Sequence, residues 1–547
     1  MGIVLKTSIL ILAVLSAGGL LAVSITQANF PGSMFAERLL AERQTSFLFQ
    51  DELPIPPRIV VPPGQTEVTI TSSQISWQYH SSFPASPALG YNGTTPGPTI
   101  EVESGQFVRV HWKNELPAQH IFAAPLGQMT CAGPPVRGVT HLHGAEVSEP
   151  NVTDKTRNSD GWPDLWTAPG EEQIAEYPNQ QSARTLWYHD HAVGDTGRNV
   201  AAGLVGLYLI HDDYERSLQL PSGAFDIPLL FQSQGMNGDG TRYYTKDIAK
   251  EFYGNAAAVN GKLYPYVNVE PRKYRFRFVN GSNARSYAFK VWKEADHTSG
   301  PPIYQIGSDG GFLAHTVVLN DPNTPNSPRL LLLPGERADV ILDFSSYAGQ
   351  KLALHNSNLD PGDGEIPLDL TMEFRVGTAL TAADTSRVPS EMREIPRIPP
   401  SSAVATRKIV LGHRDLPGGG QMLTLNGAQW SDPVTEKPKL GTTEIWEIVN
   451  TEIDRHPFHV HLVNFQVLDR RPFDVSGFLK NGELTYTDSA QAPADNELGW
   501  KDVVRVEPGM VTRIIATFGP YIGHYIYHCH ILEHEDMDMM RPFEVVP

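Results

Sequence analysis

The chain has 547 residues and a formal net charge of −18, with 61 acidic and 43 basic side chains and no basic block. This balance excludes nucleic acid as an expected partner. The length exceeds what one hydrophobic core accommodates, so we test for three domains. The 44 prolines and 47 glycines, with Val, Thr, Tyr and Phe in short runs between them, indicate a mostly β protein.

The first 28 residues have the pattern of a secretory signal peptide. Lys6 precedes an apolar run from Ile9 to Val23, and cleavage is expected after Ala28. The run approaches the length that spans a membrane, so an uncleaved N-terminal anchor is the alternative. No later segment has such a run, and we expect a secreted or periplasmic, extracytoplasmic protein without further membrane contact.

Three segments repeat one pattern: an Asn-Gly pair, a proline-containing stretch, two alternating strands and a closing asparagine. They begin near Asn92, Asn260 and Asn426, which are 168 and 166 residues apart. Such a long period predicts three copies of one β-domain rather than a solenoid.

The predicted domain boundaries follow from this repeat and from a Pro- and Ser-rich linker that ends near residue 400. An N-terminal arm is expected at 29–60, the first domain at 61–212, the second with its linker at 213–400 and the third at 401–547.

Ten of the 19 histidines fall into four clusters, all in the first and third copies of the repeat. Each contains an H-x-H pair in a segment with strand character, and this spacing directs two imidazoles to one face of a strand. The clusters are His141 and His143; His189 and His191; His456, His459 and His461; and His528, His530 and His534.

The chain has two cysteines, and one of them, Cys529, lies between two histidines. A Cys131–Cys529 disulfide is the ordinary expectation outside the cytoplasm. However, one thiolate, two imidazoles and a weak methionine ligand form a blue-copper site. Cys529, His534 and Met539 have suitable spacing, and His456 is the candidate second imidazole. Cys131 then remains as a buried free thiol, with an intermolecular disulfide as the alternative.

Eight clustered histidines remain, more than one ion can use, so a second centre with more than one metal ion is expected. His528 and His530 flank Cys529 on the opposite strand face and belong to this second centre. Cys529 would then join the two centres and carry electrons between them. Structural zinc is the rival, but closed zinc sites favour more cysteines.

The motifs "HLHG", "WYHDH", "HPFHVH" and "HCHILEHEDMDMM" resemble those of the multicopper oxidases, in the same order. The likeness covers nearly the whole chain after the signal. The segments "NGKLYPYVNVEPRKYRFRFVNGSNAR" and "VLDRRPFD" are similar in sequence to the family branch that holds bacterial spore-coat laccase and bilirubin oxidases.

This resemblance implies an all-β chain of three consecutive cupredoxin-like Greek-key β-sandwich domains, with four copper ions. Type 1 copper would take His456, Cys529, His534 and Met539, and type 2 copper His141 and His459. The two type 3 ions would take His143, His189, His191, His461, His528 and His530.

The implied activity is one-electron oxidation of phenols, aromatic amines or bilirubin-like pigments, coupled to four-electron reduction of dioxygen to water. By motif position, Glu535 and Asp160 resemble the acidic residues that deliver protons, whereas Asp190 should point away from the metals. The partners are then a small reducing substrate and dioxygen, and a monomer is expected.

Two other functions stay open at this point. One is a metallo-oxidase acting on Fe(II) or Cu(I); ferrous oxidation needs carboxylates beside the type 1 histidine, and Asp454, Glu533 and Asp536 are candidates. The other is a copper-binding cupredoxin protein without turnover, which the full set of twelve ligands disfavours.

Overall fold

The computed structural model describes residues 47–547 except for 127–134, 151–153, 155, 358–367 and 416–420. The expected signal peptide, most of the N-terminal arm and Cys131 therefore lie outside the described residues. Within the described residues, no helix is long and apolar enough to cross a membrane.

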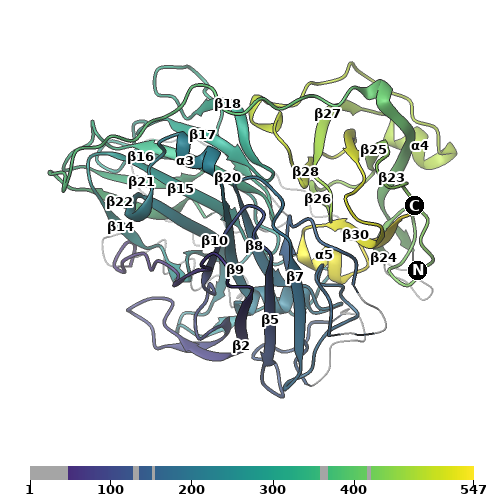
Figure 1. Ribbon diagram of the computed structural model, residues 1–547, viewed down its shortest axis with the longest axis horizontal. Coiled ribbons are helices and arrows are strands. Elements are labelled where there is room, and N and C mark those ends of the chain that lie inside the picture. Colours follow the sequence, from purple (N-terminus) through teal and green to yellow (C-terminus); the bar gives the residue numbers. More distant parts are fainter. Residues whose placement is uncertain (1–46, 127–134, 151–153, 155, 358–367, 416–420) are drawn as a thin grey trace, which may run out of the picture.

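Within the described residues, six β-sheets form three pairs, and each pair uses about one third of the chain (Figure 1). The first pair has the strand orders β1-β4-β9-β8-β6 and β3-β2-β5-β7. Its strands are β1 (Arg58–Val60), β2 (Glu67–Trp77), β3 (Ser86–Tyr91), β4 (Thr99–Glu103), β5 (Val108–Glu115), β6 (Thr140–His143), β7 (Glu172–Tyr177), β8 (Arg184–Asp190) and β9 (Val205–His211).

The second pair, teal in Figure 1, has the orders β13-β12-β10-β15-β20-β17-β18 and β14-β22-β21-β16-β19, with β11 paired to β10. Its strands are β10 (Asp226–Met236), β11 (Arg242–Tyr243), β12 (Ala256–Val259), β13 (Lys262–Leu263), β14 (Tyr266–Val269), β15 (Lys273–Asn280), β16 (Tyr287–Lys293), β17 (Ile303–Ser308), β18 (Gly311–Leu319), β19 (Leu330–Leu332), β20 (Arg337–Asp343), β21 (Lys351–Asn356) and β22 (Leu370–Val376).

The third pair, green to yellow in Figure 1, has the orders β24-β23-β25-β29-β27 and β28-β26-β30-β31. Its strands are β23 (Ala403–Asp415), β24 (Gln421–Leu425), β25 (Thr443–Asn450), β26 (His456–Val460), β27 (Phe465–Pro472), β28 (Val503–Val506), β29 (Met510–Thr517), β30 (Gly523–Cys529) and β31 (Met540–Val545).

Helices are few and short in the described residues: α2 (Thr196–Ala202), α3 (Asp213–Ser217), α4 (Val475–Asn481) and α5 (Leu532–Asp536), with 3-10 turns at Gly223–Phe225, Pro400–Ser402 and Asp495–Glu497. The carboxylate of Asp536 in α5 accepts the main-chain N–H groups of Thr196 and Gly197 (3.1 and 2.8 Å). This contact joins the third sandwich to the first.

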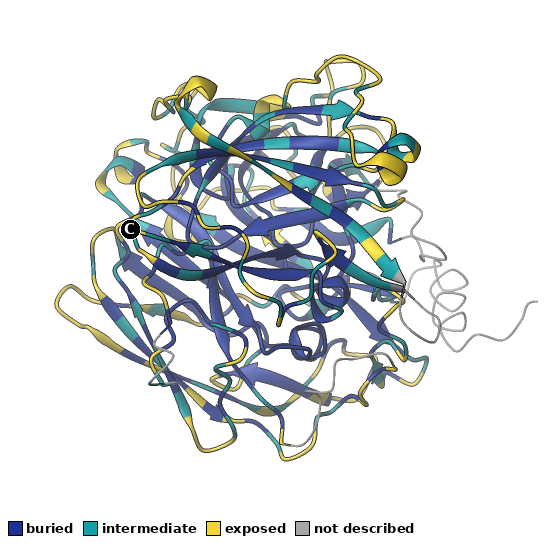
Figure 2. Ribbon diagram, turned by 90° about the vertical axis from the view of Figure 1, so that its right-hand side faces the viewer, coloured by how far each residue is buried: buried dark blue, intermediate teal, exposed yellow. Residues whose placement is uncertain are grey.

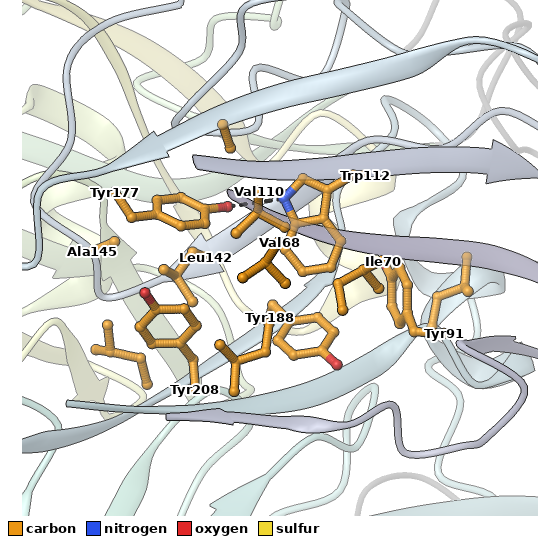
Figure 3. Close-up of a cluster of buried hydrophobic side chains, with 14 of the residues drawn as sticks. Val68, Ile70, Tyr91, Val110, Trp112, Leu142, Ala145, Tyr177, Tyr188 and Tyr208 are labelled. Carbon is orange, nitrogen blue, oxygen red and sulfur yellow. Dashed lines mark hydrogen bonds between the residues drawn. The ribbon is translucent and has the colours of Figure 1, made fainter. Parts of the chain in front are cut away.

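Each pair of sheets encloses its own hydrophobic core, so the chain is three sandwiches in series. Figure 3 shows the first core, where Tyr91 packs edge-on against Trp112 and Tyr188, with ring centroids 5.5 and 5.1 Å apart. Figure 2 shows that buried residues, in dark blue, fill the interior of the molecule, whereas many loops at its edges are exposed. The all-β prediction and the three-domain architecture are confirmed.

The sequence repeat has an atomic counterpart. Asn92, Asn260 and Asn426 all adopt positive φ, which asparagine tolerates better than most residues. In each sandwich the side-chain oxygen of this asparagine accepts a main-chain N–H from a neighbouring strand, at 2.8, 2.9 and 2.7 Å respectively. The repeated Asn-Gly thus marks the same strand-locking turn three times.

Candidate metal centre

The eight histidines outside the cysteine site gather between the first and third sandwiches. In the first, β6 pairs antiparallel with β8, so that His141 lies opposite His189. In the third, β26 pairs with β30, so that His459 lies opposite His528. Because alternate side chains share one face of a strand, each sandwich contributes four imidazoles, at most 1% exposed: His141, His143, His189, His191, His459, His461, His528 and His530.

Two stacked ring pairs bridge the two sandwiches. The rings of His141 and His461 have centroids 3.9 Å apart and an interplanar angle of 21°. Those of His143 and His459 are 3.8 Å apart at 14°. Each stack joins one H-x-H pair of the first sandwich to one of the third, so the site is approximately two-fold symmetric.

Main-chain carbonyl groups fix the tautomers of several rings. The Nδ1 of His189 lies 2.9 Å from the carbonyl oxygen of Asp190, and that of His528 lies 2.9 Å from the carbonyl oxygen of Cys529. A carbonyl oxygen can only accept, so Nδ1 carries the proton and Nε2 keeps its lone pair.

Two aspartates each hold two imidazoles. The carbonyl oxygen of Asp160 accepts from Nδ1 of His141 (2.5 Å), and its carboxylate lies 3.0 Å from Nδ1 of His461. The carbonyl oxygen of Asp502 accepts from Nδ1 of His459 (2.7 Å), and its carboxylate lies 3.1 Å from Nε2 of His143. One aspartate comes from each sandwich that supplies histidines.

The nitrogens turned toward the middle of the site have no hydrogen-bond partner although they are buried. This holds for Nε2 of His141, His189, His191, His459, His461 and His528. Convergent, unprotonated imidazole nitrogens are the donor set that copper prefers. The residues therefore fit the metal that the motifs imply.

Burial favours the neutral form of several of these rings. It lowers the pKa of His189 to about 4, and it lowers the pKa of His141 and His459 well below the usual value, with neighbouring imidazoles adding to the effect. Neutral rings have free lone pairs, which metal binding requires.

His456, Cys529 and His534 form a second, separate cluster. The Sγ of Cys529 lies 3.3 Å from Nδ1 of His456 and 3.7 Å from Nδ1 of His534, and the two nitrogens are 3.3 Å apart. These spacings suit one ion with bonds of about 2.0–2.3 Å to nitrogen and sulfur. Cys529 is a fully buried free thiol, and Cys131, its alternative partner from the sequence, lies outside the described residues.

Met539 is the methionine best placed for this cluster. It is fully buried in the same core as Cys529, its carbonyl accepts the N–H of Cys529, and its N–H donates to His534. Met540 packs instead into another cluster with Trp430, and Met537 is only half-buried.

The strand β30 links the two clusters. His528 points toward the eight-histidine site and Cys529, the next residue, toward the sulfur cluster, since neighbouring side chains on a strand face opposite ways. His530 follows beyond the strand end and returns to the histidine site. Neighbouring residues of one strand therefore face the two clusters.

Sequence reasoning missed Glu251, which lies in the second sandwich region between β11 and β12. Its carboxylate is 2.8 Å from Nε2 of His534 and accepts a hydrogen bond from the hydroxyl of Tyr253. Burial opposes ionisation, but the charge and hydrogen bond of His534 outweigh it and lower the pKa of Glu251 to about 2. Nothing in the local sequence signals this contact.

The other expected carboxylates differ in where they point. Glu535 lies between Nδ1 of His191 (3.3 Å) and Nδ1 of His528 (3.1 Å), beside the histidine site. Asp190 points away from the site and accepts from Asn199 and two main-chain N–H groups, as expected.

The carboxylates considered for a ferrous site do not gather at His534. Glu533 accepts from the hydroxyl of Tyr244 and the amide of Asn283, and Asp536 accepts from the first turn of α2. Asp454 is exposed. Glu251 occupies the edge of His534 instead.

Comparisons with known proteins agree with this site. Sequence profiles described as multicopper oxidase match residues 404–547 and residues 69–123 and 137–215. A laccase of Bacillus subtilis (strain 168) is 41% identical over 527 residues, covering 91% of this chain and 98% of the laccase. The chain belongs to the multicopper oxidase family.

Two further proteins of the family are similar to this multicopper oxidase. A bilirubin oxidase of Albifimbria verrucaria is 33% identical over 520 residues, covering 91% of this chain and 81% of that protein. The crystal structure of the McoA multicopper oxidase from the hyperthermophile Aquifex aeolicus matches with a TM-score of 0.74 and 28% identity, covering 91% and 100% of the two chains. The family resemblance seen in the motifs is confirmed, and the enzyme is a copper-dependent, laccase-like oxidoreductase with dioxygen as electron acceptor.

Proposed function

We propose that this oxidase holds four copper ions, with reducing substrates oxidised at the Cys529 cluster and dioxygen reduced to water at the histidine site. Type 1 copper takes His456, Cys529, His534 and Met539; type 2 takes His141 and His459; type 3 takes His143, His189, His191, His461, His528 and His530. The observation that carries this proposal is the position of Cys529 in β30, directly between two imidazoles of the other site.

The bound copper ions supply one-electron redox chemistry. The residues of this chain supply the rest. We place electron entry at the edge of His534, whose Nε2 faces Glu251 and none of the other proposed ligands. From Cys529, the shortest covalent route to the histidine site is one residue along the chain, back to His528 in β30 or forward to His530 beyond the end of the strand.

Protons must reach the histidine site, and two buried carboxylates lie beside it. Burial raises the pKa of Asp160 to about 8, and one of its carboxylate oxygens has no hydrogen-bond partner. Glu535 touches His191 and His528 from the other side. We assign proton delivery to these two residues.

The proposed substrates are phenols, aromatic amines or bilirubin-like pigments. The names of the relatives, laccase and bilirubin oxidase, support this range. The protein's own phenol group gives a precedent: the hydroxyl of the Tyr253 side chain donates a hydrogen bond to Glu251, beside His534. A substrate hydroxyl can form the same hydrogen bond within reach of the His534 ring.

The test is to load the purified protein with copper, record the visible spectrum, and follow oxygen uptake with a phenol, bilirubin and Fe(II) in parallel. An intense blue thiolate band and uptake with the phenol or pigment are expected. Cys529→Ser should lose both colour and turnover. Absence of the blue band, or fewer than about three bound coppers, contradicts the proposal, and uptake with Fe(II) alone supports the metallo-oxidase alternative.

The cellular and chain-level assignments complete the proposal. Residues 1–28 direct export and are removed, the mature protein is extracytoplasmic and monomeric, and its domains span 61–212, 213–400 and 401–547. The composition of the N-terminal segment and the three sandwich cores support this division. N-terminal sequencing of exported protein and light scattering of the purified chain test it.

A further inference from the structure

Arg337 lies at the start of β20 in the second sandwich, the one that supplies none of the ten clustered histidines. It is 1% exposed, and all five of its guanidinium N–H groups have acceptors. The Nε–H donates to the carbonyl of Thr185 in the first sandwich (3.2 Å), and Nη1 and Nη2 donate to the carbonyls of Gly335 and Asp309 (3.1 Å each).

The two remaining donors both go to Asp502 in the third sandwich. Nη1 donates to Oδ1 at 2.6 Å and Nη2 to Oδ2 at 2.5 Å, a bidentate pair that fixes the carboxylate plane. Arg337 therefore contacts all three sandwiches at once.

Asp502 passes this restraint on to two ligands. Its carbonyl oxygen holds Nδ1 of His459, and its Oδ1 holds Nε2 of His143. The two rings are the closest stack of the site, one from each sandwich. One residue thus sets the orientation of imidazoles on both sides of the interface.

The contact has a specific chemical result at His143. Its Nε2 donates to the carboxylate, so its Nδ1 keeps the lone pair and lies 3.2 Å from Nε2 of His530. His141, His189, His459, His461 and His528 show the opposite arrangement, with Nδ1 held and Nε2 turned inward.

We propose that Arg337 is a positioning residue for the histidine site: by gripping Asp502 from the second sandwich, it makes His143 face the site through Nδ1 and fixes His459 beside it. The inference rests on the copper assignment proposed above. It gives the second sandwich, which holds no metal ligand, a defined part in building the oxygen-reducing site.

Packing around the pair leaves little freedom for a substitute. A Cβ on Gly144, the residue after His143, would lie 2.7 Å from both Nη2 of Arg337 and Oδ2 of Asp502. Lys501 neutralises the neighbouring charges, with Nζ 2.8 Å from Asp309 and 2.9 Å from Glu336. The pair is thus embedded in a complete ionic network.

A lysine cannot replace Arg337, because an ammonium group has three donors and no planar fork. Arg337 also lines a cavity of about 630 Å³ between the second and third sandwiches, together with Glu336 and Lys501. A shorter reach at this position would let water from the cavity compete for Asp502.

The test compares Arg337→Lys with Arg275→Lys. Arg275 makes a buried pair with Asp339, also in β20, and contacts no clustered histidine, so its variant controls for loss of a buried arginine pair. We measure copper per chain after dialysis against a chelator, the blue thiolate absorbance, and the melting temperature of the copper-free protein.

For Arg337→Lys we expect the affinity of the histidine site for copper to fall roughly 10–100-fold, with unchanged blue absorbance per chain. Arg275→Lys should keep the copper affinity and the blue absorbance of the wild type. Wild-type copper retention in Arg337→Lys overturns the inference, as does an equal copper loss in the two variants with equal falls in melting temperature, since that would be a structural effect only.

Crystal structures of the copper-free proteins decide the point independently of metal binding. In Arg337→Lys the ring of His143 should leave Asp502 or turn, whereas in Arg275→Lys it should stay. An unmoved His143 in Arg337→Lys overturns the positioning role even if wild-type protein binds copper normally. A wild-type protein that binds no copper contradicts the proposed function, and the ring orientation still tests Arg337.

Discussion

Asp160 and Asp502 occupy equivalent places on opposite sides of the histidine site. Each holds one imidazole through its carbonyl oxygen and another through its carboxylate. Only Asp502 is gripped by a guanidinium; one carboxylate oxygen of Asp160 is buried without a hydrogen-bond partner.

The two aspartates make the same kinds of contact with histidines but differ in their charged surroundings. Burial raises the pKa of Asp502 as well, but Arg337 opposes this effect, and its two charge-assisted hydrogen bonds make Asp502 a rigid support. Burial without a cation raises the pKa of Asp160 to about 8, so it can hold a proton near neutral pH. The Arg337 guanidinium is thus the main structural difference between the two aspartates.

Removing the carboxylate of Asp502, which Arg337 holds, should have the largest effect on stability and copper content. Asp502→Ala removes the bidentate partner of the buried Arg337 and leaves only the Asp309 carboxylate, 3.7 Å away, beside its charge, so we expect the free energy of unfolding to fall by about 3–5 kcal/mol. Histidine-site copper should be lost as well, because His143 loses its partner. Denaturant titration of copper-free protein and metal analysis check this, and stability within about 1 kcal/mol of wild type would contradict it.

On the proton-carrying side, Asp160→Asn should spare the structure but slow the reaction. The amide oxygen can still accept from Nδ1 of His461, but the side chain has no proton to transfer. We expect kcat for oxygen uptake to fall about 10²-fold, with copper content and melting temperature retained. Unchanged kcat would assign proton delivery to another group.

One glycine lies close to each aspartate, Gly144 beside Asp502 and Gly161 next to Asp160 in the chain. Gly144 and Gly161 both have positive φ, and alanine there costs about 1–3 kcal/mol. The new Cβ of Gly144→Ala meets Arg337 and Asp502, whereas that of Gly161→Ala meets the main chain of His141. Both variants should lower the melting temperature.

Gly105→Ala is the matched control, because Gly105 has φ of +80° and nothing within 4 Å of the added Cβ. It should lose stability from backbone strain alone and keep its copper. Gly144→Ala should also lose histidine-site copper. Equal copper retention in the two variants would show that the Arg337–Asp502 pair tolerates displacement.

The smallest effect is expected for an ionic cluster that touches no metal ligand. His211 lies 2.6 Å from Glu215 and 3.5 Å from Glu101. Burial opposes its protonation, but the two carboxylates prevail and raise the pKa of His211 to about 9. A raised folded-state pKa stabilises the protein fully below the unfolded value near 6.5 and no longer above about 9.

His211→Gln should therefore lower the free energy of unfolding by about 1–2 kcal/mol at pH 6 and have little effect at pH 10. Copper content should not change at either pH. Thermal melts of the copper-free variant and wild type at the two pH values measure this, and an equal deficit at both would refute the ionic origin.

Much of the site was predictable because its ligands are short-range patterns. The H-x-H pairs fix which imidazoles share a strand face, and Cys529, His534 and Met539 fall within one segment. The turn asparagines at 92, 260 and 426 likewise marked the repeat. These features depend on local geometry, which spacing along the chain encodes.

The supporting residues were not predictable in this way. Glu251 reaches His534, and Arg337 reaches Asp502, only through the docking of one sandwich on another. No spacing rule connects residues so far apart. The carboxylates near His534 in sequence, Glu533 and Asp536, turned out to bind elsewhere for the same reason: α5 directs them toward Tyr244 and α2.

The sandwich interface divides the two centres unequally. The sulfur cluster takes His456, Cys529 and His534 from the third sandwich alone, whereas the histidine site is shared equally between the third and the first. Partial separation of the sandwiches would split the oxygen-reducing site and leave the sulfur cluster whole. A heat-damaged sample of this enzyme should therefore stay blue after it has stopped consuming oxygen, so colour is a poor measure of its shelf life.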